Sequence, residues 1–93
     1  MFSMAIVVNV WAQGTLKGKI TDEKTGETLV GVTLSVLELK TVGTASDEDG
    51  EFELKLPEGT YTVQVRYLGY TTKEVSGIKV DKASITPLNV AIK

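Results

Sequence analysis

The sequence predicts an all-β sandwich, and three observations lead to that prediction. Apolar residues recur at every second position from Thr15 onward, which is the spacing of a strand with one buried face. Turn-forming residues interrupt this alternation at short intervals. No window of helical length has apolar residues at three-and-four spacing. We therefore expect about seven short strands, arranged as a Greek-key sandwich of two facing sheets.

The first part of the alternating region predicts two strands and a turn. The first strand covers residues 15–21 and ends at Asp22–Glu27, a segment rich in turn-forming residues. The second strand follows, and around residues 37–39 the alternation changes phase, which indicates a bulge or the end of a strand. The residues expected on the inner face are Leu16, Gly18 and Ile20 in the first strand and Val32, Leu34 and Val36 in the second.

The middle of the chain predicts three strands. A short run at residues 42–46 leads into a tight connection at Asp47–Gly50. Two longer strands follow, separated by the strand-breaking sequence Pro57-Glu58-Gly59. The second of these strands has the cleanest alternation in the chain. The residues expected on the inner face are Phe52, Leu54 and Leu56, and then Tyr61, Val63, Val65 and Tyr67.

The last part predicts weaker strands. Leu68–Tyr70 is expected to turn the chain, and two short runs follow at residues 71–75 and 78–80, separated by Gly77. The final strand has Leu88, Val90 and Ile92 on one face. There is no internal repeat, low-complexity tract or linker, so we expect one domain.

The first twelve residues carry no charge and resemble the apolar segment of a secretory leader. They are too few to span a bilayer, which takes about 20 apolar residues. Val10 and Ala12 stand at the −3 and −1 positions of a plausible cleavage site. We interpret residues 1–12 as a signal peptide, truncated at its start because no Lys or Arg precedes the apolar run, and residues 13–93 as the mature domain. The alternative is a β-branched first strand, Ile6 to Trp11.

The composition disfavours several classes of function. Hydrophobic residues make up 42% and charged residues 24%, which is typical of a globular chain. The net charge is −2 and no two basic residues are adjacent, so we expect no nucleic-acid partner. Histidine and cysteine are absent, which removes the commonest proton-transfer group, the thiolate nucleophile and the main transition-metal ligands. We expect no catalytic site, no metal and no cofactor.

An ordered series of motifs resembles a known family, the carboxypeptidase regulatory-like domain. This resemblance covers residues 15–93 and implies a transthyretin-like, immunoglobulin-like sandwich. The motifs that carry it are Gly18-Lys-Ile-Thr-Asp22, Thr25-Gly26, Leu29-Val-Gly31-Val32, Gly43-Thr-Ala-Ser-Asp47-Glu-Asp-Gly50-Glu-Phe52, Pro57-Glu-Gly59-Thr-Tyr61 and Gly69-Tyr70.

The sequence is most similar to the variant at the N-terminus of TonB-dependent outer-membrane receptors, which import glycans and similar large solutes. The resemblance implies a non-catalytic periplasmic domain, exported to the periplasm or outer membrane, that acts beside a plug and a barrel or with another envelope protein. Neither plug nor barrel is present in this sequence, and none of the mature chain is expected to cross a membrane. The alternative is a free-standing exported module that binds a glycan or a protein.

Two candidate sites are outweighed by simpler interpretations. Four carboxylates have the spacing of a calcium-binding loop, but Phe52 stands where that loop requires Gly, so we expect a hairpin turn instead. A Lys–Asn isopeptide bond, as in similar adhesin domains, needs a nearby acid, and the corresponding position is Val65. The carboxylates are Asp47, Asp49, Glu51 and Glu58, and the bond would join Lys17 or Lys19 to Asn89.

Aromatic side chains are the remaining candidates, because they can stack on sugars. Tyr61 and Tyr67 share a face with Val63, so core packing explains them. Tyr70 follows Gly69 in a predicted loop and is the candidate for a surface interaction.

Overall fold

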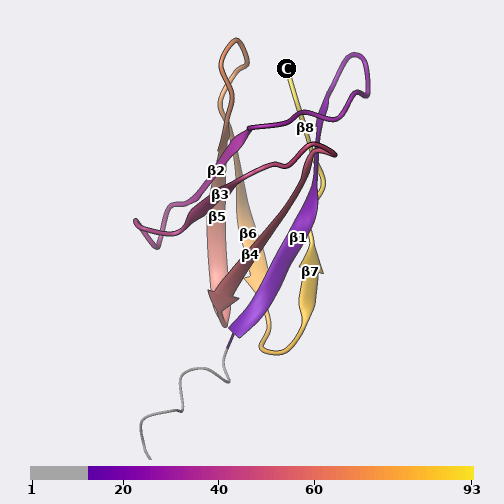
Figure 1. Ribbon diagram of the computed structural model, residues 1–93. Coiled ribbons are helices and arrows are strands. Elements are labelled where there is room, and N and C mark those ends of the chain that lie inside the picture. Colours follow the sequence, from indigo (N-terminus) through magenta and orange to yellow (C-terminus); the bar gives the residue numbers. More distant parts are fainter. Residues whose placement is uncertain (1–12) are drawn as a thin grey trace, which may run out of the picture.

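The computed structural model describes residues 13–93, which form two packed β-sheets (Figure 1). The predicted signal peptide, and the alternative strand within it, lie outside the described residues. Among residues 13–93 no helix is long and apolar enough to cross a membrane. One sheet contains β4 (Glu51–Pro57), β1 (Gln13–Asp22), β7 (Ile85–Pro87) and β8 (Val90–Ile92). The other contains β3 (Gly43–Ala45), β2 (Thr33–Val36), β5 (Gly59–Arg66) and β6 (Lys73–Val80).

The β1 strand is the centre of its sheet and uses both of its backbone edges. Ile20 donates its N–H to the carbonyl of Gly50 at 2.7 Å, so the even-numbered residues of β1 bond to the β4 side. The odd-numbered residues point the other way. Thr15 donates to the carbonyl of Ser84 at 2.8 Å, and Leu88 donates to the carbonyl of Lys17 at 2.9 Å. The antiparallel β4 and the parallel β7 and β8 therefore lie on opposite edges of β1.

The strands β7 and β8 act as one strand with an interruption. Both pair in parallel with β1, β7 at residues 15–17 and β8 at residues 20–22. Between them the backbone of Leu88 lies over Gly18, so closely that a Cβ on Gly18 would be 1.6 Å from the Leu88 carbonyl oxygen. Counted as one interrupted strand, β7 and β8 reconcile the eight observed strands with the predicted architecture of seven.

The core lies between the two sheets and confirms most of the predicted inner faces, whereas Tyr67 and Leu88, also expected there, are only partly buried. The burial pattern alternates strictly along β4 and through most of β5. Burying these side chains away from water is the main favourable term for the fold. The buried hydrophobic residues are Leu16, Ile20, Val32, Leu34, Val36, Phe52, Leu54, Leu56, Tyr61, Val63, Val65, Ile78, Val80, Val90 and Ile92.

The chain crosses from one sheet to the other between β4 and β5, and a tyrosine holds this corner. Tyr61 donates its hydroxyl to the carbonyl of Pro57, four residues upstream, at 2.6 Å. Its ring lies against Gly59, where a Cβ would meet the phenol at 3.2 Å. This geometry is a tyrosine corner of the kind found in immunoglobulin-like sandwiches. Burial also raises the pKa of the Tyr61 phenol, which keeps it protonated as a donor.

The sequence prediction was wrong for two strands, because it divided β6 (Lys73–Val80) and did not include β7 (Ile85–Pro87). Residues 71–75 and 78–80 were expected as separate runs, but β6 continues from Lys73 to Val80. Gly77 has a positive φ of 69°, and the pairing with β5 shifts by one residue between Tyr61 and Val63. A glycine in this conformation accommodates the extra residue as a bulge without ending the strand.

Replacing Gly18 by Ala should destabilise the domain, because the new methyl group would collide with the backbone at Leu88. Backbone cannot rotate away as a side chain can, so we expect a loss of about 1–3 kcal/mol in the free energy of unfolding. Urea denaturation followed by Tyr fluorescence measures it. Lys17→Ala is the matched control on the same strand, and its exposed side chain should change stability by less than about 0.5 kcal/mol. Equal urea midpoints for the two variants would contradict the close approach of Leu88.

Candidate functional site

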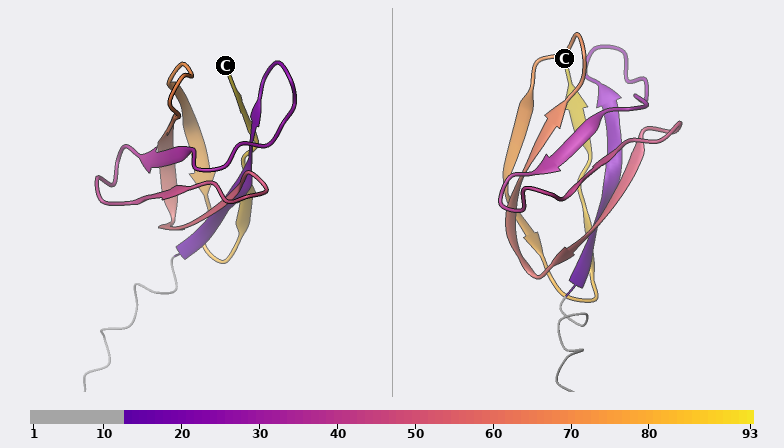
Figure 2. Two further views of the ribbon diagram at one scale, coloured as in Figure 1. Left: turned by 45° about the horizontal axis from the view of Figure 1, so that its top comes forward. Right: turned by 60° about the vertical axis from the view of Figure 1, so that its left-hand side comes forward.

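The loops β1–β2 and β5–β6 and the C-terminal residue meet at one end of the sandwich, which we call the loop end (residues 22–32, 67–72 and Lys93). Figures 1 and 2 show that β1 begins at the opposite end. Thr71 donates its N–H to the carbonyl of Lys93 at 2.7 Å, so a backbone hydrogen bond joins the two sheets here. The first strand of the described chain therefore begins at one end of the domain, and the chain ends at the other.

A hydrogen bond between Tyr70 and Asp22 holds the loop end together. The Tyr70 hydroxyl donates to Oδ2 of Asp22 at 2.6 Å. The other carboxylate oxygen, Oδ1, accepts from the backbone N–H groups of Lys24 at 2.8 Å and Thr25 at 3.1 Å. Asp22 thus closes its own turn and binds a loop 48 residues away. The bond from Tyr70 and the backbone donors lower the pKa of Asp22, and the bond to Asp22 raises the pKa of Tyr70.

A shallow surface depression lies beside this hydrogen bond. It has a volume of about 480 Å³. Leu68 at its rim is 95% exposed, which is unusual for a large apolar side chain, and the Tyr67 ring packs on Tyr70 with centroids 5.4 Å apart. An aromatic ring, a guanidinium and hydroxyls are groups that can stack on and hydrogen-bond a sugar or a peptide. The lining residues are Gly31, Thr33, Arg66, Tyr67, Leu68 and Thr72.

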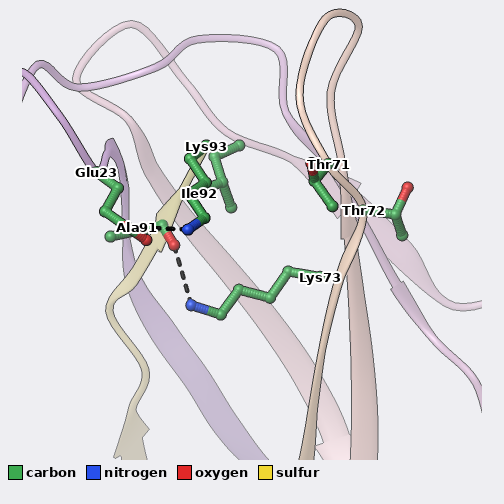
Figure 3. A pocket seen from close by; sticks show the side chains of 7 residues that line it. All are labelled: Glu23, Thr71, Thr72, Lys73, Ala91, Ile92 and Lys93. Atoms are coloured by element: carbon green, nitrogen blue, oxygen red, sulfur yellow. Dashed lines mark hydrogen bonds and ion pairs between the residues drawn. The ribbon is translucent and has the colours of Figure 1, made fainter.

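A smaller pocket opens between β6 and β8 (Figure 3). Its volume is about 180 Å³, enough for one side chain or a few waters. Lys73 reaches across it and donates to the carbonyl of Ala91 at 3.1 Å, and Lys93 lies 3.8 Å from the carboxylate of Glu23. Both ammonium groups already have protein partners, so neither lysine offers an unpaired charge to a ligand, and Lys73 links the two sheets.

The predicted turn at Asp47–Gly50 is confirmed in detail. Oδ1 of Asp47 accepts from the backbone N–H groups of Asp49 and Glu51, each at 2.9 Å, and Gly50 has a positive φ of 76°. The side chain acts as a turn cap, which is the ordinary role of Asp in this position. Among residues 13–93 no group of three or more Asp or Glu side chains is arranged to hold a metal ion.

The groups considered for an isopeptide bond are used differently. Oδ1 of Asn89 accepts from the backbone N–H of Lys19 at 3.1 Å, which ties the start of β8 to β1. Lys17 is exposed on the outer face of the sheet, and Val65 is fully buried. The bond of Asn89 therefore positions the strands, and Val65 stands at the position where the isopeptide bond would need a carboxylic acid.

Tyr70, the residue singled out from the sequence, belongs to the loop end but is only partly exposed. Its hydroxyl is occupied by Asp22, so its ring edge and its neighbours Tyr67 and Leu68 form the accessible surface. A role for Tyr70 in surface binding remains a prediction. Sequence reasoning missed its bond to Asp22, because Asp22 was explained fully by the turn that follows it.

Sequence reasoning also missed Ser46, the buried polar residue of the described chain. Its hydroxyl donates to the carbonyl of Leu29 at 2.6 Å and accepts from the N–H of Val32 at 2.9 Å. These bonds fix the β1–β2 loop against the end of β3. The only available signal was a Ser in place of an apolar residue at the end of a strand.

The pH dependence of stability tests the bond between Asp22 and Tyr70. Because the folded-state pKa of Asp22 lies below its ordinary value of 3.8, the bond stabilises the domain above about pH 4 and is lost as the pH falls further. Tyr70→Phe should lower Tm at pH 7 and reduce the loss of Tm between pH 5 and pH 2.5. Tyr67→Phe, on the neighbouring ring, should keep the wild-type pH profile. If the Tm of Tyr70→Phe and the Tm of the wild type fall by the same amount on acidification, the bond does not contribute to stability.

Comparison with known proteins places this geometry in a family. A model of the carboxypeptidase regulatory-like domain matches residues 15–93. Bacillopeptidase F of Bacillus subtilis is 40% identical over 65 residues, covering 69% of this chain and 4% of that protein. TonB-dependent receptor P3 of Formosa agariphila is 33% identical over 76 residues, covering 81% of this chain and 8% of the receptor. The chain thus spans less than a tenth of these relatives.

Solved structures share the fold. A chain of the type II cohesin–X-dockerin complex from Acetivibrio cellulolyticus superposes with a TM-score of 0.70 and 26% identity, over 83% of this chain and 52% of that one. The Bacillus anthracis TIE protein superposes with a TM-score of 0.67 and 26% identity, over 87% of this chain and 16% of that one. With the family model matched across both sheets, the chain belongs to the carboxypeptidase regulatory-like domain family.

Proposed function

We propose that this domain is a non-catalytic accessory module of a TonB-dependent outer-membrane receptor, and that it lies in the periplasm. The observation that carries the proposal is the similarity to TonB-dependent receptor P3, which extends over most of this chain but over a small part of the receptor. A match of that shape is expected when one module is shared by larger proteins. The same reasoning applies to Bacillopeptidase F, so the shared unit is a module rather than an activity.

The arrangement of the termini supports a spacer or docking role. The β1 strand begins at one end of the sandwich, and the C-terminus lies at the opposite end (Figure 2). A rigid two-sheet domain with this geometry holds whatever precedes and follows it apart. Its polar side chains support this role, because Asp22, Ser46 and Asp47 bond mainly to backbone groups of turns.

The receptor assignment also suggests the cargo. The receptors that this chain resembles take up large nutrients, so we propose a glycan as the solute of the complete system. In this proposal the barrel transports the solute, and the present domain positions or regulates the receptor from the periplasmic side.

Fractionation of the source cells tests the receptor proposal. We expect an antibody raised against residues 15–93 to detect one band much heavier than 10.0 kDa in the outer-membrane fraction. Marker proteins of the inner membrane, periplasm and outer membrane control the separation. A band of about the mass of this chain in the soluble periplasmic fraction would overturn the receptor assignment.

A second candidate function is an exported module that binds a glycan or a protein by itself. The depression beside Leu68 favours it, because an exposed apolar residue adjoins Tyr67 and Arg66. The fold shared with a chain of a cohesin–X-dockerin complex is compatible with a role in assembly.

Titration with a panel of soluble glycans, followed by NMR, distinguishes this candidate. If the module binds sugars, shifts should cluster at Arg66–Tyr70 and at Thr33, and Tyr67→Ala should weaken binding at least about tenfold, as expected for the loss of a stacking ring. Lys82→Ala, on an exposed loop at a distance from the loop end, is the control and should bind normally. Absence of shifts across the panel would remove glycan binding as the function.

A further inference from the structure

The four outer edges of the two sheets differ in how well they are protected against pairing with another strand. An exposed edge with unpaired N–H and C=O groups is a template for strand addition unless it is short, bulged or interrupted. The β3 edge is only three residues long, and β6 contains the bulge at Gly77. The β7–β8 edge is interrupted at Leu88 and includes Pro87. Each of these three edges therefore carries a feature that opposes pairing.

The β4 edge lacks such a feature along its middle. It is seven residues long and pairs with β1 in one unbroken register, from Pro57 opposite Gln13 to Glu51 opposite Lys19. Since the even-numbered residues of β4 bond to β1, the backbone groups of the odd-numbered residues point away from the sheet. In the right-hand view of Figure 2, β4 runs along the side of the sandwich beside β1.

At both ends of this edge, backbone groups are already bonded or absent, so only the middle of the strand is available for pairing. At one end, Glu51 donates to Oδ1 of Asp47 and accepts from the N–H of Asp47 at 2.8 Å. At the other end, Pro57 has no N–H to donate. Within the described chain, Glu53 and Lys55 remain with outward N–H and C=O groups that no strand pairs.

We propose that two copies of this chain associate through β4, antiparallel, with Glu53 of each copy opposite Lys55 of the other. In this register the two open residues of one copy face the two open residues of the second. Glu53 of each copy and Lys55 of the other form a hydrogen-bonded pair, and the two pairs together make four backbone hydrogen bonds. Leu54 of one copy lies opposite Leu54 of the other, on the two-fold axis. The β4-containing sheets of the two copies then join into one continuous sheet, and on its outer face each Glu53 side chain lies opposite a Lys55 side chain of the other copy.

The neighbouring registers are disfavoured by the same residues. A shift in one direction places Glu53 opposite Glu53 and requires the Glu51 backbone, which Asp47 already occupies. A shift in the other direction places Lys55 opposite Lys55 and brings Pro57 against Glu53. Like charges directly opposed across strands are destabilising. Charge and backbone availability thus select the same single register.

Among residues 13–93, the surroundings of β4 leave room for the second copy. The strand of the other sheet on this side is β3, which is short and consists of Gly43, Thr44 and Ala45. Such small residues do not project over the approaching strand. Because one pair of short strands buries little surface, we expect weak association, with a dissociation constant of roughly 10–1,000 μM.

Two charge variants of the full chain, studied separately and mixed, test the pairing. Glu53→Lys places Lys opposite Lys in a self-pair, and Lys55→Glu places Glu opposite Glu. Each variant alone should therefore self-associate at least about tenfold more weakly than wild type in sedimentation equilibrium, since two attractive pairs become repulsive. Mixed one to one, they should form a heterodimer of about wild-type affinity, because both opposed pairs become Lys–Glu again.

Matched controls separate this pairing from general charge effects. Glu74→Lys and Lys79→Glu on β6 change the net charge of −2 by the same steps, to 0 and −4 respectively, yet leave β4 intact. Each should self-associate like wild type. Thermal unfolding at low concentration checks that the β4 variants are folded, because Glu53 also lies opposite Lys17 within the chain. A monomeric wild type at millimolar concentration, or a mixture no more associated than the separate variants, would overturn the proposal.

A backbone variant provides an independent test. The N–H of Lys55 points away from β1, so Lys55→Pro removes an outward donor while the pairing of β4 with β1 persists. We expect it to reduce self-association further than Lys55→Thr, which loses the charge but keeps the N–H. In the wild type, hydrogen exchange at Glu53 and Lys55 should slow with increasing protein concentration. Equal association of the Pro and Thr variants, or exchange independent of concentration, would exclude pairing through the β4 backbone.

Discussion

The β1 strand pairs along both of its backbone edges, and this constraint fixes the positions of the other strands of its sheet. Its even-numbered residues bond to β4 and its odd-numbered residues bond to β7, β8 and the segment between them. A slip of one residue would exchange these partners and turn Leu16 and Ile20 from the core to solvent. Gly18 adds a second constraint, because only a residue without Cβ lets the backbone at Leu88 lie against β1. Hydrogen bonding, burial and close packing thus require the same register.

Much of this arrangement could be predicted from the sequence, because alternation reports burial directly. The inner faces of β1, β2, β4 and β5 follow from period two alone. The misreading of β6 had a local cause. Gly77 separates two apolar runs, and sequence does not distinguish a glycine that ends a strand from one that forms a bulge within it. The strand β7 was missed because its exposed residues and Pro87 have no alternating apolar pattern, and its pairing depends on β1.

The loop end was predictable in location but not in its contacts. Gly69 predicted the turn and hence the loop that presents Tyr70, whereas the partner of Tyr70 lies 48 residues away. Asp22 and Ser46 illustrate the same limit. Each has a side chain whose local role is common, and each also binds a distant loop whose path is set by the packing of the two sheets. Long-range polar contacts of this kind depend on tertiary geometry, so residue type and spacing do not encode them individually.

The two surfaces that we propose for interactions lie in different directions on the domain. The loop end is at the pole where Lys93 leaves the sandwich, and the open edge of β4 runs along its side. Contacts at the pole involve turns held by Asp22 and Tyr70, whereas contacts along β4 use backbone groups of a strand whose register β1 already fixes. The two kinds of contact share no residue. A module joined end to end with its neighbours therefore keeps its lateral edge available, and pairing through β4 would bring two such assemblies side by side without displacing anything bound at the loop end.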